Sequence, residues 1–218
     1  MKVENLLGEI LLEREWRVRE LNIYLSIPHR YSNLLFQNIK SSYLNMCIPM
    51  IYAHWEGFVV QSVSLVYQYL NLLSIKHQDI HKNLAVVSLS PLMHKLSGNC
   101  SRDKEREFYN AFIEQYSEEV YIDYKTQSIA QSNLNFRQIT KILDDLGLDN
   151  KFLYPYESSI EKLLNYRNRI AHGENSIIVE ESDLIFFVSQ ITELFDLLIL
   201  RIKDYLMNKE YLIADHLV

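Results

Sequence analysis

Residues 182–206 read SDLIFFVSQITELFDLLILRIKDYL, and this stretch decides the fold class. Its apolar residues recur every three or four positions, which is the period of an α-helix buried along one side. Ser182 stands where the N-cap of this helix is expected. The predicted core side consists of Leu184, Phe187, Val188, Ile191, Leu194, Phe195, Leu198 and Ile202.

The same helix has apolar residues on its other sides, namely Ile185, Phe186, Leu197, Ile199 and Leu200. We therefore expect it either to lie at the centre of a bundle or to contribute to an oligomer interface. Gln190, Glu193 and Asp196 would be costly in lipid, so the stretch favours a buried helix over a membrane span. No membrane contact is predicted.

Helical spacing continues along most of the chain. The expected helices cover residues 2–25, 32–73, 77–96, 103–116, 135–146 and 156–172. Pro49 should kink or split the second of them, and Gly147 and Gly173 stand where helices should stop. Residues 117–134 are polar and lack a period, which indicates an insertion; within it residues 120–122 suggest a minor strand, and residues 176–179 a second short strand or a loop.

The composition supports the same fold class. Only 5 Gly and 4 Pro occur in 218 residues, which leaves few turns for a many-stranded fold. The prediction is a single all-α domain over residues 1–218: an elongated bundle of long antiparallel helices with a small polar insertion at 117–134.

Charge and cysteine content limit the function and the compartment. A formal net charge of −6 argues against a surface that coats nucleic acid indiscriminately, although a small basic cleft is compatible with it. Cys47 and Cys100 are far apart and have no His or Cys at ligand spacing, which favours reduced thiols in a cytosolic protein. Glu4 and Glu9 interrupt the apolar run that a signal peptide would need, so we expect a cytoplasmic protein.

The densest cluster of chemically active side chains is NYRNRIAHGE at residues 165–174. Arg167, Asn168, Arg169 and His172 place two guanidiniums, an amide and an imidazole within six residues. Arginine offers a planar fork that matches phosphate oxygens, and histidine holds or releases a proton near neutral pH. Such a set can cleave a phosphodiester without a metal ion.

Helix geometry leaves two interpretations of this cluster open. On an ideal helix Arg167 and His172 point about 140° apart, so they converge on one phosphate only if the helix ends near them or if a second copy brings its own pair. Gly173 stands where such an ending is expected. The structural alternative is that Arg and His in the last turn meet the negative end of the helix dipole, with Gly173 as the cap.

Other histidines are weaker candidates. His54 and Glu56 lie on the helix predicted over 32–73, where they are expected either to support the cluster or to be structural. His77 and His81 have a metal-capable spacing, but no third ligand accompanies them, so we expect surface residues and no metal site.

Four stretches carry a resemblance to a known family. Arg167 and His172 form an R-x4-H motif with polar Asn168 after the Arg; residues 52–58 read YAHWEGF; and residues 132–135 and 146–149 read SNLN and LGLD. Together they resemble a bacterial nuclease branch of the HEPN superfamily from residue 50 to about 205. The resemblance implies a helical bundle, commonly dimeric, in which two motifs meet at a cleft.

Many members of that superfamily are metal-independent RNases of toxin–antitoxin, abortive-infection or related defence systems, and others are non-catalytic. The resemblance therefore implies RNA as substrate, no cofactor, a homodimer, and control by a separate antitoxin or regulator. His172 would move the proton when a 2′-hydroxyl attacks the adjacent phosphate, and Arg167 would stabilise the charged transition state. Asn168 would orient the phosphate or His172, and Arg169 would add an optional phosphate contact. The alternative is a HEPN-like module that binds nucleotide or RNA, or acts as an adaptor, without catalysis.

Overall fold

The chain is all-α over the residues that the computed structural model describes, which are 2–28, 37–94, 101–124, 133–174 and 177–213. The elements are α1 (Val3–Ser26), α2 (Gln37–Asn71), α3 (Lys82–His94), α4 (Arg102–Tyr116), α5 (Phe136–Leu146), the 3-10 helix η3 (Lys151–Tyr156), α6 (Glu157–Ala171) and α7 (Glu181–Met207). No strand occurs in these ranges, so the all-α prediction is confirmed. The predicted loop at 97–99 and Cys100 lie outside the described residues.

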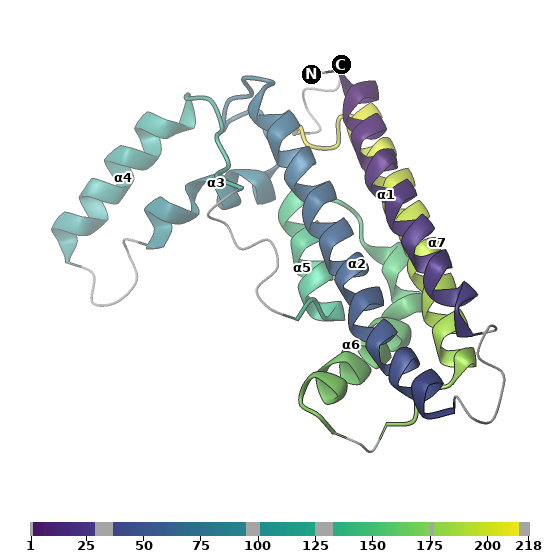
Figure 1. The fold of residues 1–218 in the computed structure, drawn as a ribbon. Coiled ribbons are helices and arrows are strands. Elements are labelled where there is room, and N and C mark those ends of the chain that lie inside the picture. Colours follow the sequence, from purple (N-terminus) through teal and green to yellow (C-terminus); the bar gives the residue numbers. More distant parts are fainter. Residues whose placement is uncertain (1, 29–36, 95–100, 125–132, 175–176, 214–218) are drawn as a thin grey trace.

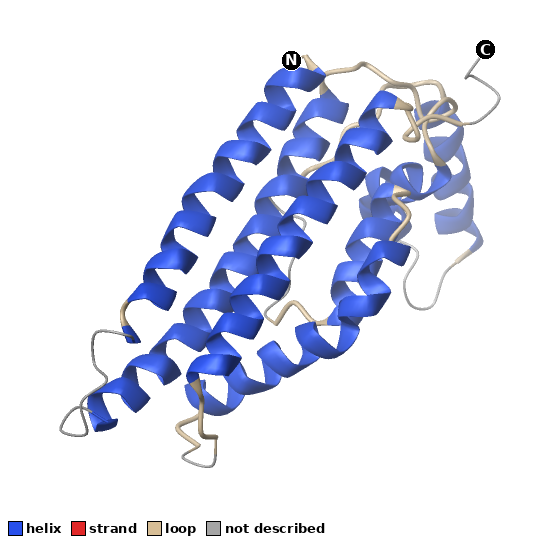
Figure 2. Ribbon diagram, turned by 90° about the vertical axis from the view of Figure 1, so that its right-hand side faces the viewer, coloured by secondary structure: helices blue, strands red, loops and turns tan. Residues whose placement is uncertain are grey.

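Helices α1, α2 and α7 lie side by side and form the main bundle (Figures 1 and 2). The apolar side predicted for α7 is buried, and Phe195 of α7 packs against Trp55 and Phe58 of α2 with ring centroids 6.5 and 4.2 Å apart. These large rings fill the centre of the bundle, where aromatic side chains bury the most apolar area.

The directions of the long helices differ in part from the prediction. Helix α1 runs antiparallel to α2, which a short connection between them favours. Helices α2 and α7 run in the same direction: Lys40 near the start of α2 forms a 2.7 Å ion pair with Glu181 at the start of α7. Parallel neighbours are possible here because the described residues between α2 and α7 include four α-helices and the 3-10 helix η3.

Two predicted local features are wrong: a split of α2 at Pro49 and a Ser182 N-cap for α7. Helix α2 continues through Pro49, which excludes the split. Ser182 lies inside α7, whose N-cap is Glu180: the Glu180 carboxylate accepts from the Asp183 backbone N–H, and Asp183 accepts from the Glu180 N–H at 3.2 Å. This reciprocal capping box satisfies two backbone donors, which a Ser182 cap two residues later would not do.

Residues 120–122, suggested as a minor strand, form no strand, and residues 177–179 form the loop that was the alternative there. Residue 176 lies outside the described residues. Val120 and Ile122 are buried, but the backbone there forms only an isolated bridge, between Lys76 and Glu119. The Asn71 side-chain amide holds Ile122 in two ways: Nδ2 donates to the Ile122 carbonyl, and Oδ1 accepts from the Ile122 N–H, each at 2.9 Å. These contacts anchor the segment that follows α4. They take the place of a sheet in the described part of residues 117–134.

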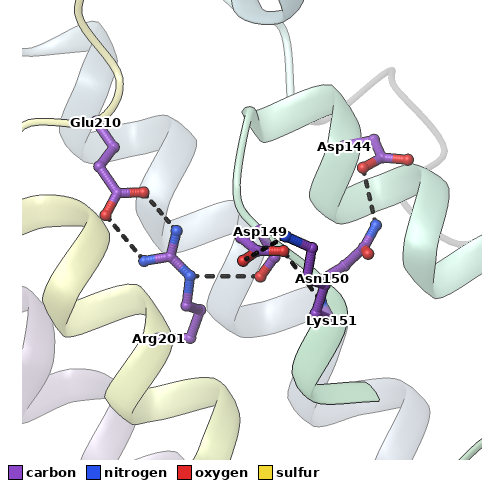
Figure 3. A network of polar contacts seen from close by, with 6 residues as sticks. All are labelled: Asp144, Asp149, Asn150, Lys151, Arg201 and Glu210. Atoms are coloured by element: carbon purple, nitrogen blue, oxygen red, sulfur yellow. Dashed lines mark hydrogen bonds and ion pairs between the residues drawn. The ribbon is translucent and has the colours of Figure 1, made fainter. Parts of the chain in front are cut away.

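A polar network ties the connection between α5 and η3 to α7. Arg201 of α7 forms an ion pair with Glu210 and donates from Nε to the Asp149 carbonyl at 3.3 Å, while Asn150 donates to Asp144 at 2.8 Å (Figure 3). The hydrogen bond from Arg201 lowers the pKa of the Glu210 carboxyl. The α5–η3 connection and the turn after α7 are thus tied to one guanidinium, so η3 and α6 begin from a fixed position.

None of the helices in the described ranges is long and apolar enough to cross a bilayer.

Candidate functional site

Arg167 of α6 is held between two asparagines and an aromatic ring. Its Nη1 donates to Asn133 Oδ1 at 2.7 Å and to Asn168 Oδ1 at 2.8 Å. The guanidinium carbon lies 5.1 Å from the centre of the Tyr52 ring on α2, which is a cation–π distance. Both hydrogen bonds use Nη1, and no described residue accepts from Nη2 or Nε. Arg167 is therefore fixed in direction while most of its donors remain available to an anion.

A second set of contacts fixes the ring under Arg167. The Tyr52 hydroxyl donates to Glu56 Oε1 at 2.9 Å, and the Leu134 backbone N–H donates to the same oxygen at 3.4 Å. Burial and the Glu56 carboxylate raise the pKa of Tyr52 well above its ordinary value, so the phenol stays neutral and donates. Glu56 thus joins α2 to the loop that carries Asn133.

That loop is also tied to α6. Asn133 has a positive φ of 80°, which asparagine tolerates better than most residues. Asn135 caps α5 through a complete capping box with Gln138, and the Phe136 N–H donates to Glu161 of α6 at 2.9 Å. The approach to α5 therefore presents the Asn133 oxygen to Arg167 from a rigid backbone.

Helix α6 ends at the motif, as predicted. His172 is the C-cap, Gly173 has a φ of 73°, the Gly173 N–H donates to the Ile170 carbonyl and the Glu174 N–H to the Arg169 carbonyl. This is a Schellman ending, which needs a left-handed residue at position 173. The His172 side chain is exposed and makes no hydrogen bond to a described residue. It is presented to solvent just beyond Arg167.

Asn168 and Arg169 have different partners. Asn168 accepts from Arg167 through its side chain, and its backbone carbonyl accepts from the His172 N–H at 3.0 Å. It therefore contacts both motif residues. Arg169 forms a 2.8 Å ion pair with Glu174 through Nε, so part of its fork is engaged within the motif segment.

His54 lies away from Arg167. It is two residues from Tyr52, which places the two side chains on opposite sides of α2. His54 is buried against α1, where its Nε2 lies 3.2 Å from Glu20 Oε2 and 3.3 Å from the Tyr24 hydroxyl. The structure thus separates the two upstream candidates: Glu56 belongs to the Arg167 network, and His54 belongs to the α1–α2 contact.

Acidification is expected to destabilise the protein through His54. Burial, assisted by the nearby Arg17 charge, lowers the pKa of His54, although Glu20 opposes the shift. Below about pH 6.5 the unfolded chain therefore binds more protons at His54 than the folded chain does. The contribution of neutral His54 to the free energy of unfolding is complete above that pH and declines as the pH falls toward the lowered pKa. Melting curves from pH 7.5 to 5 should show a smaller loss for His54→Gln than for wild type. An equal loss in the His54→Gln variant would assign the pH dependence to other groups.

The remaining sequence candidates form no site in the described part of the chain. His77, expected at the surface, is buried and bonded to the Glu118 carbonyl at 3.0 Å and to Ser88 at 3.1 Å. Its ring is needed to anchor the segment after α4. Cys47 is a buried free thiol. The described residues contain no group of three His, Cys, Asp or Glu placed to hold a metal ion.

Tyr52 and Asn133 contact Arg167 but were not predicted as site residues, whereas Glu56, the hydrogen-bond partner of Tyr52, was. Tyr52 and Glu56 are four residues apart on one helix, a spacing that allows the hydrogen bond observed between them. Asn133 comes from a loop 34 residues upstream of Arg167. Both belong to the YAHWEGF and SNLN stretches, so these stretches held the signal, but only the fold shows which of their side chains reach Arg167.

Comparison with known proteins identifies a family. The family model described as RiboL-PSP-HEPN matches residues 12–204, which include α2, α5, α6 and nearly all of α7. No curated protein and no solved structure matches the chain.

Proposed function

The chain belongs to the RiboL-PSP-HEPN family, a HEPN-type family, and from this premise we propose that it is a metal-independent endoribonuclease. The observation that carries the proposal is the Arg167 guanidinium, held by Asn133, Asn168 and the Tyr52 ring beside the helix end that exposes His172. A fixed fork with free donors and an exposed imidazole, five residues apart at the end of one helix, are the two kinds of group that phosphodiester cleavage needs, one for the developing charge and one for the transferred proton.

The proposed reaction needs only the RNA and these side chains. His172 takes the proton of a ribose 2′-hydroxyl, and the 2′-oxygen attacks the adjacent phosphorus. Arg167 stabilises the additional negative charge on the phosphate oxygens, and the bond to the 5′-oxygen breaks as that oxygen takes up a proton. The products are a 2′,3′-cyclic phosphate and a 5′-hydroxyl. DNA lacks the 2′-hydroxyl and is therefore not a substrate.

A homodimer would supply the second proton-transfer group, with one His172 as base and the other as acid. An exposed apolar face of α2 supports such a pairing: Met46 is 69% and Met50 47% exposed. Met46, Met50 and exposed Ala53 lie about 100–160° around the helix from Tyr52. A copy bound there would therefore use a different face of α2 from the one that holds the Arg167 network. Large exposed apolar side chains are typical of interaction faces.

We further propose that the enzyme is a toxin or defence effector controlled by a separate protein. Membership of the family supports a toxin or defence role. A separate controlling protein is expected because uncontrolled RNA cleavage would harm the cell that makes the enzyme. The net charge of −6 suits a basic regulator or antitoxin better than broad RNA coating.

The test is incubation of the purified protein with a mixed-sequence RNA and with its all-deoxy counterpart, both in EDTA. We expect cleavage of the RNA alone, with 2′,3′-cyclic phosphate ends. Cleavage of the DNA or products with 3′-hydroxyl ends would contradict the proposed chemistry. RNA that is bound but left intact across varied sequences would instead favour a non-catalytic RNA-binding or adaptor module.

A further inference from the structure

Helix α4 carries an apolar stripe that no described residue covers. Tyr109 is 63%, Ile113 52% and Tyr116 49% exposed, and α4 has no buried residue. Figure 1 shows α4 projecting away from the bundle of α1, α2 and α7. The three side chains recur at intervals of four and three residues, so they share one face of the helix.

The stripe is held in a fixed direction. The segment after α4 is joined to the segment before α3 by hydrogen bonds from the His77 N–H to the Glu118 carbonyl and from the Val120 N–H to the Ile75 carbonyl. Directly beside the stripe, the half-buried rings of Phe108 and Phe112 lie 6.2 Å apart, and Phe112 lies 6.1 Å from the Tyr116 ring. A 15-residue helix is marginally stable without tertiary packing, so α4 gains from a partner on its open face.

The charges beside the stripe indicate what that partner is. Arg106, Asn110 and Glu114 recur every fourth residue along one edge of the stripe. When two such helices pair antiparallel about a two-fold axis at Asn110, the Arg106 of each faces the Glu114 of the other. We propose that α4 pairs with α4 of a second copy of this chain, with Tyr109 and Ile113 at the centre of the contact.

This contact is independent of the proposed nuclease reaction. Figure 1 places α4 far from α6, which carries Arg167 and His172. A 15-residue helix is about 22 Å long, so the pairing buries an area at the low end of protein interfaces. It should therefore be measured at tens to hundreds of micromolar protein, by sedimentation equilibrium.

Ile113→Glu places a carboxylate in the centre of the pairing and is expected to weaken self-association through α4 by at least about tenfold, lowering the average mass. The matched control is Leu12→Glu, which changes an exposed leucine in the interior of α1. Circular dichroism should show that both variants keep their helix content. An unchanged mass for Ile113→Glu at all concentrations would overturn the proposal.

A charge exchange distinguishes α4 pairing from any other use of this face. Arg106→Glu alone and Glu114→Arg alone each set like charges opposite one another, so both should weaken association. The double variant Arg106→Glu with Glu114→Arg restores opposite charges at both symmetric positions and should recover the mass of the wild type. A double variant as weak as the single variants would refute the antiparallel pairing about Asn110. Neither result depends on whether the protein cleaves RNA.

Discussion

Replacing His172 by alanine is expected to lower kcat/KM for RNA cleavage by about 10²–10⁴-fold, the usual contribution of a general acid or base. His172 is exposed at the C-cap of α6, and its side chain has no hydrogen-bond partner in the described part of the chain. Its removal therefore takes away a proton-transfer group and little packing. The rate should be measured with excess enzyme over labelled RNA, from pH 5 to 8.

The control for this variant is His94→Ala, which removes another exposed histidine, at the end of α3. It should keep the wild-type rate. If His172 serves only as a helix cap, His172→Ala would lose about 0.3–2 kcal/mol of stability and leave cleavage unchanged. The two roles are thus separated by measuring the melting temperature and the cleavage rate of the same preparation.

Periodicity alone predicted most of the helices. Helices α1, α4, α5 and α7 begin and end within one or two residues of the predicted ranges. The failures have local causes. Ser182 was favoured as a cap because serine is common there, but Glu180 and Asp183 cap each other reciprocally. Pro49 removes one backbone donor, yet the long buried face on both sides of it keeps α2 continuous.

The site was predictable as a segment but not as a set of contacts. The end of α6 at Gly173 follows from glycine chemistry and was confirmed. The partners of Arg167 depend on which faces of α2 and of the loop before α5 meet α6. A single sequence does not show that pairing, because helical spacing relates residues within one helix and not between helices.

The stretch YAHWEGF illustrates the same limit. Tyr52 and Glu56 face Arg167, and Trp55 and Phe58 pack on Phe195 of α7. Position 57 faces α1, where a Cβ would come within 3.0 Å of the Arg17 guanidinium, so only glycine fits without a shift. Seven consecutive residues thus serve three interfaces, and their one-dimensional pattern does not separate these roles.

Replacing Arg167 is expected to have a similarly large effect. Arg167→Ala should lower kcat/KM by about 10²–10³-fold, the loss found when one donor to a developing oxyanion is removed. Arg167→Lys keeps the charge but loses the planar fork that Asn133 and Asn168 hold, so it should recover little of the rate. Arg102→Ala, on exposed α4, is the matched control and should leave the rate unchanged. Full activity in Arg167→Lys would contradict the role of the fork and reduce Arg167 to a source of charge.

Mixing the two inactive proteins tests whether the site is shared between copies. If Arg167 and His172 of different protomers act on one phosphate, Arg167→Ala and His172→Ala should together form mixed dimers in which one Arg167 and one His172 meet at one phosphate. These dimers should regain the part of the activity that does not need the second His172. If both residues act within one protomer, the mixture stays as inactive as its components. Within α6 the two residues point about 140° apart on an ideal helix, and no described contact joins them, so we expect recovery.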